Sequence, residues 1–135
     1  MAASFQVDVV AADRMVWTGQ AVEIIAVTTD GEVGILAGHI PLIATLAPGS
    51  AEIMTDDGRR EVVAVEGGFL SVGVDRTAII SPYAQLASEL SVDQAQKDLR
   101  EVQAAMDDGD NSIETLRRYH RATAQVKAAT RNNHD

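Results

Sequence analysis

The sequence contains no cysteine, which excludes disulfide bonds, thiolate metal ligands and thiol nucleophiles. Aromatic residues are also scarce, at 4% of the chain, so a core must be built mainly from Val, Ile and Leu. No window approaches the ~18 uninterrupted apolar residues that a membrane-spanning helix needs, and the first residues do not form a basic leader followed by an apolar stretch. We therefore expect a soluble, unexported chain with no membrane insertion of its own.

Acidic and basic residues are distributed unevenly along the chain. The net charge of −9 argues against nucleic-acid binding, because a phosphate backbone would be repelled. Residues 1–111 carry 18 acidic and 6 basic side chains, a net charge of −12, whereas residues 112–135 carry 2 acidic and 5 basic side chains, a net charge of +3. The cationic segment is either a solvated helix face or a docking surface for an acidic partner.

Residues 5–81 have the pattern of short strands separated by turns. Apolar and polar side chains alternate over residues 5–9, which is typical of a half-buried strand. A break is expected at Trp17-Thr18-Gly19, and residues 22–28 form the next strand. Asp56-Asp57-Gly58 stands between two β-branched segments and predicts a hairpin. Strands of this number and spacing predict an antiparallel β-sandwich or a flattened barrel.

After Pro82 the spacing of apolar residues becomes that of two helices, separated by Asp107-Asp108-Gly109-Asp110. Ser91 with Gln94, and Asn111 with Glu114, are the expected N-terminal capping pairs. The two helices should form an antiparallel hairpin. The expected buried stripe of the first helix is Val92, Ala95, Leu99, Val102 and Met106, and that of the second is Ile113, Leu116, Tyr119, Thr123 and Val126.

No pattern associated with catalysis or cofactor binding is found. The histidines share no metal-ligand spacing with a nearby carboxylate, and no serine stands in a nucleophile elbow. Glycine-rich phosphate-binding loops are also missing. The acidic pairs Asp56-Asp57 and Asp107-Asp108 lie in predicted turns, where Asp is favoured for its conformation. The sequence therefore favours a binding protein that is not itself an enzyme.

Three blocks do form a distinctive pattern. They are the segment Asp30–Leu42 (DGEVGILAGHIPL), the step Leu46–Gly49 (LAPG) and the segment Val65–Val72 (VEGGFLSV). In order and spacing they resemble the epsilon subunit of bacterial F-type ATP synthases, the chain called delta in mitochondria. The resemblance is strong over residues 5–80 and lies in architecture beyond them. Ala37 stands where that family usually has proline.

The resemblance implies an α+β fold: an N-terminal antiparallel β-sandwich of about ten strands over residues 1–86, and a C-terminal antiparallel two-helix hairpin over residues 87–135. It implies a non-catalytic subunit of the central stalk that couples the membrane rotor ring to the catalytic head of a proton-translocating ATP synthase. The partners would be the gamma subunit, the ring subunits and, through the second helix, the alpha/beta head. The chain would lie at the cytoplasmic face of the bacterial cell membrane, held there by the complex.

The resemblance also implies where the contacts lie. Asp30, Gly31 and Glu32 would face the rotor ring, and His39, Pro41 and Leu42 would contact gamma. The second helix would inhibit ATP hydrolysis through its cationic side chains, which are Arg117, Arg118, Arg121, Lys127 and Arg131.

No cofactor is expected. Some bacterial members of the resembled family bind ATP at the start of the first helix through an Ile/Leu-Asp-x-x-Arg-Ala motif. Here Ser91 replaces the acid and Gln94 replaces the arginine that would pair with phosphate. Binding of ATP is therefore expected to be weak or absent.

Two other classes of protein stay open at this point. One is an unrelated adaptor whose sandwich and hairpin bind another complex, which copurification with gamma would distinguish. The other is a small enzyme or ligand carrier that uses the sandwich interior. That class would require a polar cleft with a perturbed pair of titratable groups.

Overall fold

The computed structural model of the protein describes residues 3–133. Over these residues nine strands precede a short 3₁₀ helix and two α-helices. The strands are β1 (Phe5–Ala11), β2 (Met15–Thr28), β3 (Gly31–Leu36), β4 (Leu42–Thr45), β5 (Gly49–Thr55), β6 (Arg60–Val65), β7 (Phe69–Val72), β8 (Arg76–Ser81) and β9 (Ala84–Leu86). The helical part comprises η1 (Ala87–Glu89), α1 (Val92–Asp107) and α2 (Ile113–Asn132).

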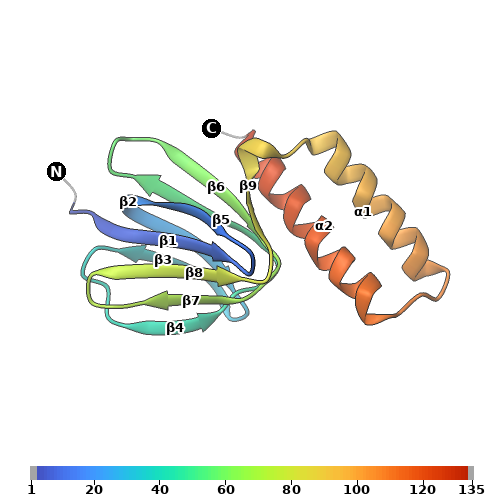
Figure 1. Ribbon diagram of the computed structural model, residues 1–135, viewed down its shortest axis with the longest axis horizontal. Coiled ribbons are helices and arrows are strands. Elements are labelled where there is room, and N and C mark those ends of the chain that lie inside the picture. Colours follow the sequence, from blue (N-terminus) through green and yellow to red (C-terminus); the bar gives the residue numbers. More distant parts are fainter. Residues whose placement is uncertain (1–2, 134–135) are drawn as a thin grey trace.

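The strands form one hydrogen-bonded sheet that folds into two layers (Figure 1). The strand order is β4-β7-β8-β1-β2-β5-β6-β9, with β3 added on β2. The long strand β2 pairs with β1 through its first half and with β3 and β5 through its second half. It thus passes from one layer to the other. We call the layer of β4, β7, β8 and β1 the front layer, and that of β3, β5, β6 and β9 the back layer.

The core lies between the two layers and is built from aliphatic side chains, as the scarcity of aromatics requires. The largest fully buried members come from both layers. Each strand contributes alternate residues, because successive side chains point to opposite faces of a strand. The core includes Val7, Val9, Ile24, Ile35, Ile53, Val63, Leu70 and Ile79.

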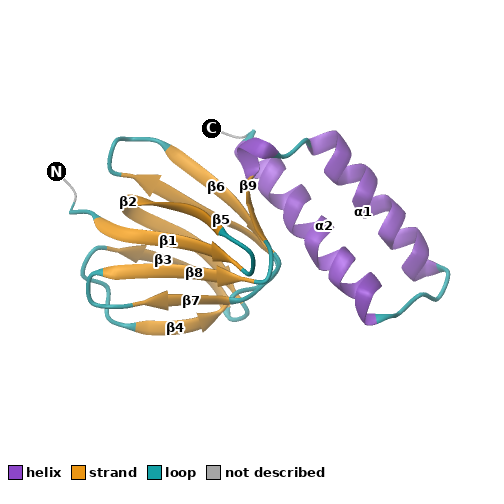
Figure 2. Ribbon diagram, in the orientation of Figure 1, coloured by secondary structure: helices purple, strands orange, loops and turns teal. Residues whose placement is uncertain are grey.

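The two helices form an antiparallel hairpin that lies beside β5, β6 and β9 of the back layer (Figure 2). Helix α2 packs on β5 and β6, and α1 packs mainly on α2. Ser91 caps α1, its Oγ accepting a hydrogen bond from the Gln94 N–H at 3.2 Å. The expected α+β fold of a β-sandwich followed by a two-helix hairpin is confirmed.

Several local expectations are wrong. No break occurs at Trp17-Thr18-Gly19, because β2 runs through these residues and the Trp17 ring lies over Gly19, where a Cβ would be 2.7 Å away. The sandwich is not fully antiparallel, since β1 pairs with β8 in parallel. The second helix is capped by Ser112, whose Oγ accepts from the Thr115 N–H, and not by Asn111.

The buried face of α2 also differs from the expected stripe. Ile113 and Leu116 are 71% and 45% exposed. The buried residues are small instead: Thr115, Ala122, Ala124, Ala128 and Ala129. Large apolar residues were expected inside because burial of large side chains contributes most to stability, but alanine allows the helix to approach the sheet more closely.

None of the helices in residues 3–133 is long and apolar enough to cross a membrane.

Candidate functional site

The outer face of the front layer carries a row of exposed apolar side chains. Phe69 lies opposite Ile80 in the β7–β8 ladder, Ile80 lies opposite Val10 across the parallel pair, and Val10 lies opposite Met15. Ile43 projects from the neighbouring strand β4. We call these five residues the apolar band.

The apolar band is unusually exposed for large hydrophobic side chains. Met15, Phe69 and Ile80 are 53%, 50% and 46% exposed, and Ile43 is 76% exposed. A mostly apolar hollow of about 400 Å³ adjoins it, lined by Ala11, Ala12, Gly68, Phe69, Ile80, Ser81 and Pro82. A contiguous exposed apolar surface of this kind is typical of a site of protein–protein contact.

Gly68 holds the backbone in place beside the apolar band. Its φ is +102°, and a Cβ at this position would lie 2.0 Å from the Ile80 carbonyl oxygen. Only glycine allows both this conformation and this close approach. The Gly67-Gly68 pair therefore sets how β7 enters the sheet next to Ile80.

The opposite end of the same face is polar. Gln6 and Thr18 both donate hydrogen bonds to Asp8 Oδ1, at 3.0 and 2.7 Å, and Gln20 donates to the Gln6 side chain at 2.9 Å. The bond from Thr18, and then that from Gln6, lowers the pKa of Asp8 below its usual range. The front face is thus divided into an apolar half and a hydrogen-bonded polar half.

The two groups of loop residues predicted to contact partners lie at opposite ends of β3. Asp30 lies in the turn before this strand, and Gly31 and Glu32 are the first two residues of the strand. Thr28 Oγ1 accepts a hydrogen bond from the Asp30 N–H and donates one to the Gly31 carbonyl. His39 and Pro41 follow the strand. A six-residue strand spans roughly 20 Å, so these groups can contact two different partners.

The interface between α2 and the back layer is built from small side chains. Ala124 and Ala128 are fully buried against Val62 and Ala64 of β6 and against Ala87. Val62 and Ala64 face the helix, while Val63 and Val65 on the same strand face the core. The apolar contact is therefore close but small in area per residue.

Polar contacts at the middle of α2 supplement this interface. Arg121 lies over the Tyr83 ring, 4.5 Å from its centroid, and its Nη2 is 3.3 Å from Glu66 Oε2. The Gln125 amide donates to the Tyr83 hydroxyl at 3.0 Å. Burial of the ring raises the pKa of Tyr83 above its usual value.

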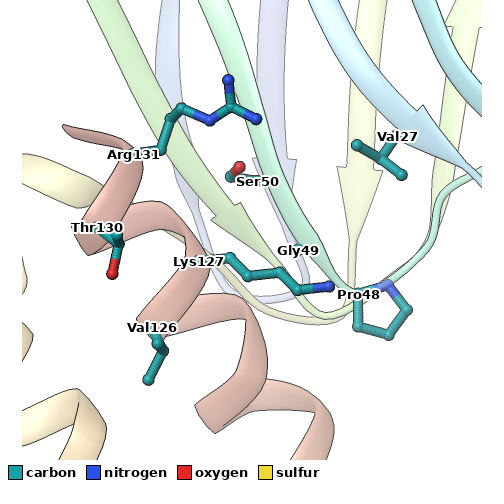
Figure 3. Close-up of a pocket in the computed structure, with 8 residues that line it drawn as sticks. All are labelled: Val27, Pro48, Gly49, Ser50, Val126, Lys127, Thr130 and Arg131. Atoms are coloured by element: carbon teal, nitrogen blue, oxygen red, sulfur yellow. The ribbon is translucent and has the colours of Figure 1, made fainter. Parts of the chain in front are cut away.

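A second polar group lies at the C-terminal end of α2. Arg131 Nη1 is 3.4 Å from Glu52 Oε2, and Arg60 Nε donates to Glu52 Oε1 at 2.8 Å. Arg60 Nη2 also donates to the Arg131 carbonyl at 2.9 Å. Figure 3 shows Lys127 extended past Gly49 towards Pro48, and Arg131 directed to the sheet beside Ser50. The residues labelled in Figure 3 line a hollow of about 620 Å³ between helix and sheet.

The comparison with protein families decides which class of protein this is. Residues 4–87 match the family described as ATP synthase, Delta/Epsilon chain, beta-sandwich domain. The chain belongs to the ATP synthase delta/epsilon family.

Curated relatives support the assignment over nearly the full length. The ATP synthase epsilon chain of Cutibacterium acnes is 44% identical over 132 residues, covering 92% of this chain and 90% of the relative. That of Streptomyces avermitilis is 37% identical over 130 residues, covering 96% of this chain and 98% of the relative. The family resemblance inferred from the three sequence blocks is confirmed.

Solved structures agree on the fold. A chain of the Euglena gracilis mitochondrial ATP synthase superposes with a TM-score of 0.75 over 98% of this chain and 82% of its own length, at 22% identity. A chain of the Tetrahymena thermophila mitochondrial ATP synthase central stalk and c-ring gives a TM-score of 0.52 at 14% identity, over 97% of each chain. The likeness includes the helical hairpin as well as the sandwich.

Within this family member, the five cations assigned to the second helix are not equivalent. Arg121 and Arg131 pair with Glu66 and Glu52 of the sandwich, and Lys127 lies along Gly49. Among the described residues, Arg117 and Arg118 form no ion pair. Arg121 and Arg131 thus face acidic side chains of the sandwich, while their role in inhibiting ATP hydrolysis stays a prediction.

Glu52, Arg60 and the alanine face of α2 are not among the functional residues predicted from the sequence. One signal was present: Val62–Val65 is a continuous apolar run, which is typical of a strand buried on both faces. Such a strand requires a second covering layer. No comparable signal pointed to Glu52, because an acid on a strand is ordinarily solvated.

The described residues offer binding surfaces and no cluster of potential metal ligands. Across residues 3–133 no group of three or more His, Asp and Glu side chains could hold a metal ion. What the geometry provides is an exposed apolar band, two exposed segments at opposite ends of β3, and a helix attached through alanines and ion pairs.

Proposed function

We propose that this chain is the non-catalytic central-stalk subunit of a proton-translocating F-type ATP synthase, coupling the rotor ring to the catalytic head through gamma. The observation that carries the proposal is the apolar band, a surface suited to a permanent partner on a chain of this family. In this function the chain lies at the cytoplasmic face of the bacterial cell membrane, bound there through the complex.

Gamma is the partner of the apolar band and of the loop that contains His39, Pro41 and Leu42, which lies at the other end of the front layer, where His39 adjoins Val72 and Arg76. Leu36 and Ile40 in and beside this loop are 58% and 75% exposed, so the loop adds apolar surface. The test is copurification: the tagged chain should retain gamma from solubilised complex, with the partner list identified by mass spectrometry. An unrelated partner set without gamma would contradict the assignment.

The rotor ring is the partner of the turn Asp30–Glu32. The turn is exposed and acidic, and such rim contacts contribute only about 0–1 kcal/mol each. Glu32→Ala should therefore weaken assembly only mildly. Glu32→Cys should crosslink to the ring in intact enzyme, whereas a cysteine at Asp57 in the β5–β6 turn should not. Crosslinking at Asp57 and not at Glu32 would refute the placement.

The hairpin inhibits ATP hydrolysis when it leaves the sandwich and reaches the alpha/beta head. Arg117 and Arg118, without ion pairs to the sandwich, are available to a partner in either position, and Arg121, Lys127 and Arg131 become available on release. Truncation after Asp110 should leave synthesis and assembly largely intact and raise hydrolysis. Unchanged hydrolysis would mean that the hairpin is a structural brace.

The function requires no cofactor, and ATP binds weakly or not at all. Ser91 Oγ is engaged in capping α1, and the Gln94 amide donates to Asp98 at 2.9 Å. Loss of a charged hydrogen bond to phosphate costs about 1.5–3 kcal/mol, roughly one to two decades of affinity. Calorimetry should give no dissociation constant in the low micromolar range.

A further inference from the structure

The buried carboxylate of Glu52 stands out among the charges of the molecule. Glu52 projects from the outer face of β5, and only 7% of the residue is exposed. A carboxylate this buried requires compensation by cations or hydrogen-bond donors. It has two, from different parts of the molecule: Arg60 on the adjacent strand β6 and Arg131 in the last turn of α2.

Arg60 has a double role in this group. It binds Glu52 Oε1 through Nε at 2.8 Å, a contact made entirely within the sandwich. Through Nη2 it also donates to the Arg131 carbonyl at 2.9 Å, one of the last carbonyls of α2. Those carbonyls lack partners within the helix and carry its negative partial charge, so a cation at this point stabilises the docked helix.

We propose that Glu52, Arg60 and Arg131, the Glu52 cluster, hold the hairpin on the sandwich and allow its reversible release. When α2 leaves, Glu52 loses Arg131 but keeps Arg60. Every buried charge of this cluster in the sandwich then still has a partner, and removal of the helix also exposes Glu52 to water. Release therefore avoids the penalty that ordinarily follows when a buried ion pair loses one partner.

The remainder of the interface suits the same role. Ala124 and Ala128 contribute little apolar area, and the polar contacts Arg121–Glu66 and Arg131–Glu52 lie at two separate points along α2. Both cations are about half exposed, at 51% and 49% of the side chain. Ion pairs of this exposure are screened by salt, so the population of docked hairpin should fall as ionic strength rises.

The inference deepens the proposed switch and rests on it only for its consequence in the assembled enzyme. Its test uses the isolated full chain, so docking can be refuted while inhibition of hydrolysis stands, and the reverse.

The absence of native cysteine permits a direct assay. Ala128→Cys places a single thiol in the interface, at a position that is fully buried in the docked state. Its rate of reaction with a thiol reagent then measures the fraction of molecules with a detached hairpin, provided that reattachment is fast. Ala104→Cys, on the exposed face of α1, supplies the intrinsic rate. Fluorescence of Trp17, the single tryptophan, reports whether the sandwich stays folded.

In the Ala128→Cys background, Arg131→Gln should raise the labelling rate about two- to fivefold, as expected for a partly exposed ion pair. Arg60→Gln and Glu52→Gln should raise it about tenfold, because each removes a contact to a charged group. Arg100→Gln, an equal charge change on the exposed face of α1, should leave the rate within about twofold. In Ala128→Cys without a further substitution, labelling should accelerate from low to high salt, and adding Glu52→Gln should reduce that dependence.

Two results would overturn the inference. One is a labelling rate for Arg131→Gln equal to that of Arg100→Gln. The other is an Arg131→Gln effect of unchanged size in the Glu52→Gln background, since residues that act through one contact must be non-additive. Glu52→Gln could also lower the stability of the sandwich, which unfolding followed by Trp17 fluorescence would reveal. In that case the inference is tested by Arg131→Gln against Arg131→Lys alone, because Lys restores the charge and should recover part of the docking.

Discussion

The two outer faces of the sandwich differ in how their apolar surface is covered. The back face, over β5 and β6, is covered by α2 through alanines and two groups of ion pairs. The front face carries larger side chains, among them Phe69 and Ile80, and residues 3–133 leave these about half exposed. The face with the larger apolar groups is thus the one left open.

The difference indicates two kinds of contact. Burial of a large apolar side chain contributes about 1.5–3 kcal/mol, so the front face favours a partner that stays bound. Alanine contacts and half-exposed ion pairs contribute much less, so the back face favours a cover that can leave. Two states that differ by only a few kcal/mol are what a conformational switch requires.

The largest expected effect is on the backbone that supports the front face. Gly68→Ala should lower the free energy of unfolding by about 3–5 kcal/mol, because a Cβ would lie 2.0 Å from the Ile80 carbonyl oxygen. Gly58→Ala is the matched control: it too has positive φ, but no atom lies within 4 Å of its Cβ, so it should cost only about 1–2 kcal/mol. Urea unfolding followed by Trp17 fluorescence measures both. Equal losses would show that the close approach to Ile80 is unimportant.

The next effect concerns partner binding by the open face. Phe69→Asp combined with Ile80→Asp should weaken capture of gamma by two decades or more, since two large apolar contacts are lost. The hairpin should stay docked, as judged by thiol labelling at Ala128→Cys. Gln20→Asp, on the polar half of the same face and opposite the neutral Gln6, is the control and should retain gamma. Retention of gamma by the double variant would place the interface elsewhere.

The sequence predicted the fold well where one local signal was decisive. The Asp56-Asp57-Gly58 turn joins β5 and β6 as expected, and the Gly67-Gly68 pair precedes β7. It failed where distant contacts decide. Trp17-Thr18-Gly19 has turn-forming glycine, yet pairing with β1 keeps these residues in one long strand. The parallel β1–β8 pair likewise joins segments far apart in the chain.

The interaction surfaces were predicted less completely than the fold. The apolar band requires the register of five strands, which no periodicity along one strand specifies. In α2 the large residues Ile113 and Leu116 were expected inside, because hydrophobicity alone cannot show how closely a helix approaches a sheet. The loop assignments at Asp30–Glu32 and His39–Leu42 stay predictions.

A smaller effect is expected from overpacking the covered face. Ala124→Leu should destabilise the docked hairpin by about 1–3 kcal/mol, because Ala124 is fully buried against β6 and detachment relieves the strain. Thiol labelling at Ala128→Cys should therefore accelerate about tenfold, while unfolding of the sandwich should change little. Ala104→Leu, on the exposed face of α1, should alter neither. A parallel loss of sandwich stability would show that the two regions unfold as one.

The smallest effect separates the two regions by pH. Asp8 lies on the front face, and its pKa is lowered by hydrogen bonds from Thr18 and Gln6. Asp110 lies in the turn of the hairpin, and its pKa is lowered by hydrogen bonds from the Thr115 hydroxyl and the Ser112 N–H. A carboxyl group whose folded-state pKa is depressed stabilises the fold above its unfolded-state pKa, and this contribution is lost as the pH falls towards the folded-state value. Both contributions should thus be complete at neutral pH and decline below about pH 4.

In an NMR titration, protonation of Asp110 should perturb the first amides of α2 and leave β1 unchanged, while protonation of Asp8 should perturb β1 and β2 only. Asp110→Ala should remove the first response and keep the second. Simultaneous changes in both regions would contradict the independence of the hairpin from the open face.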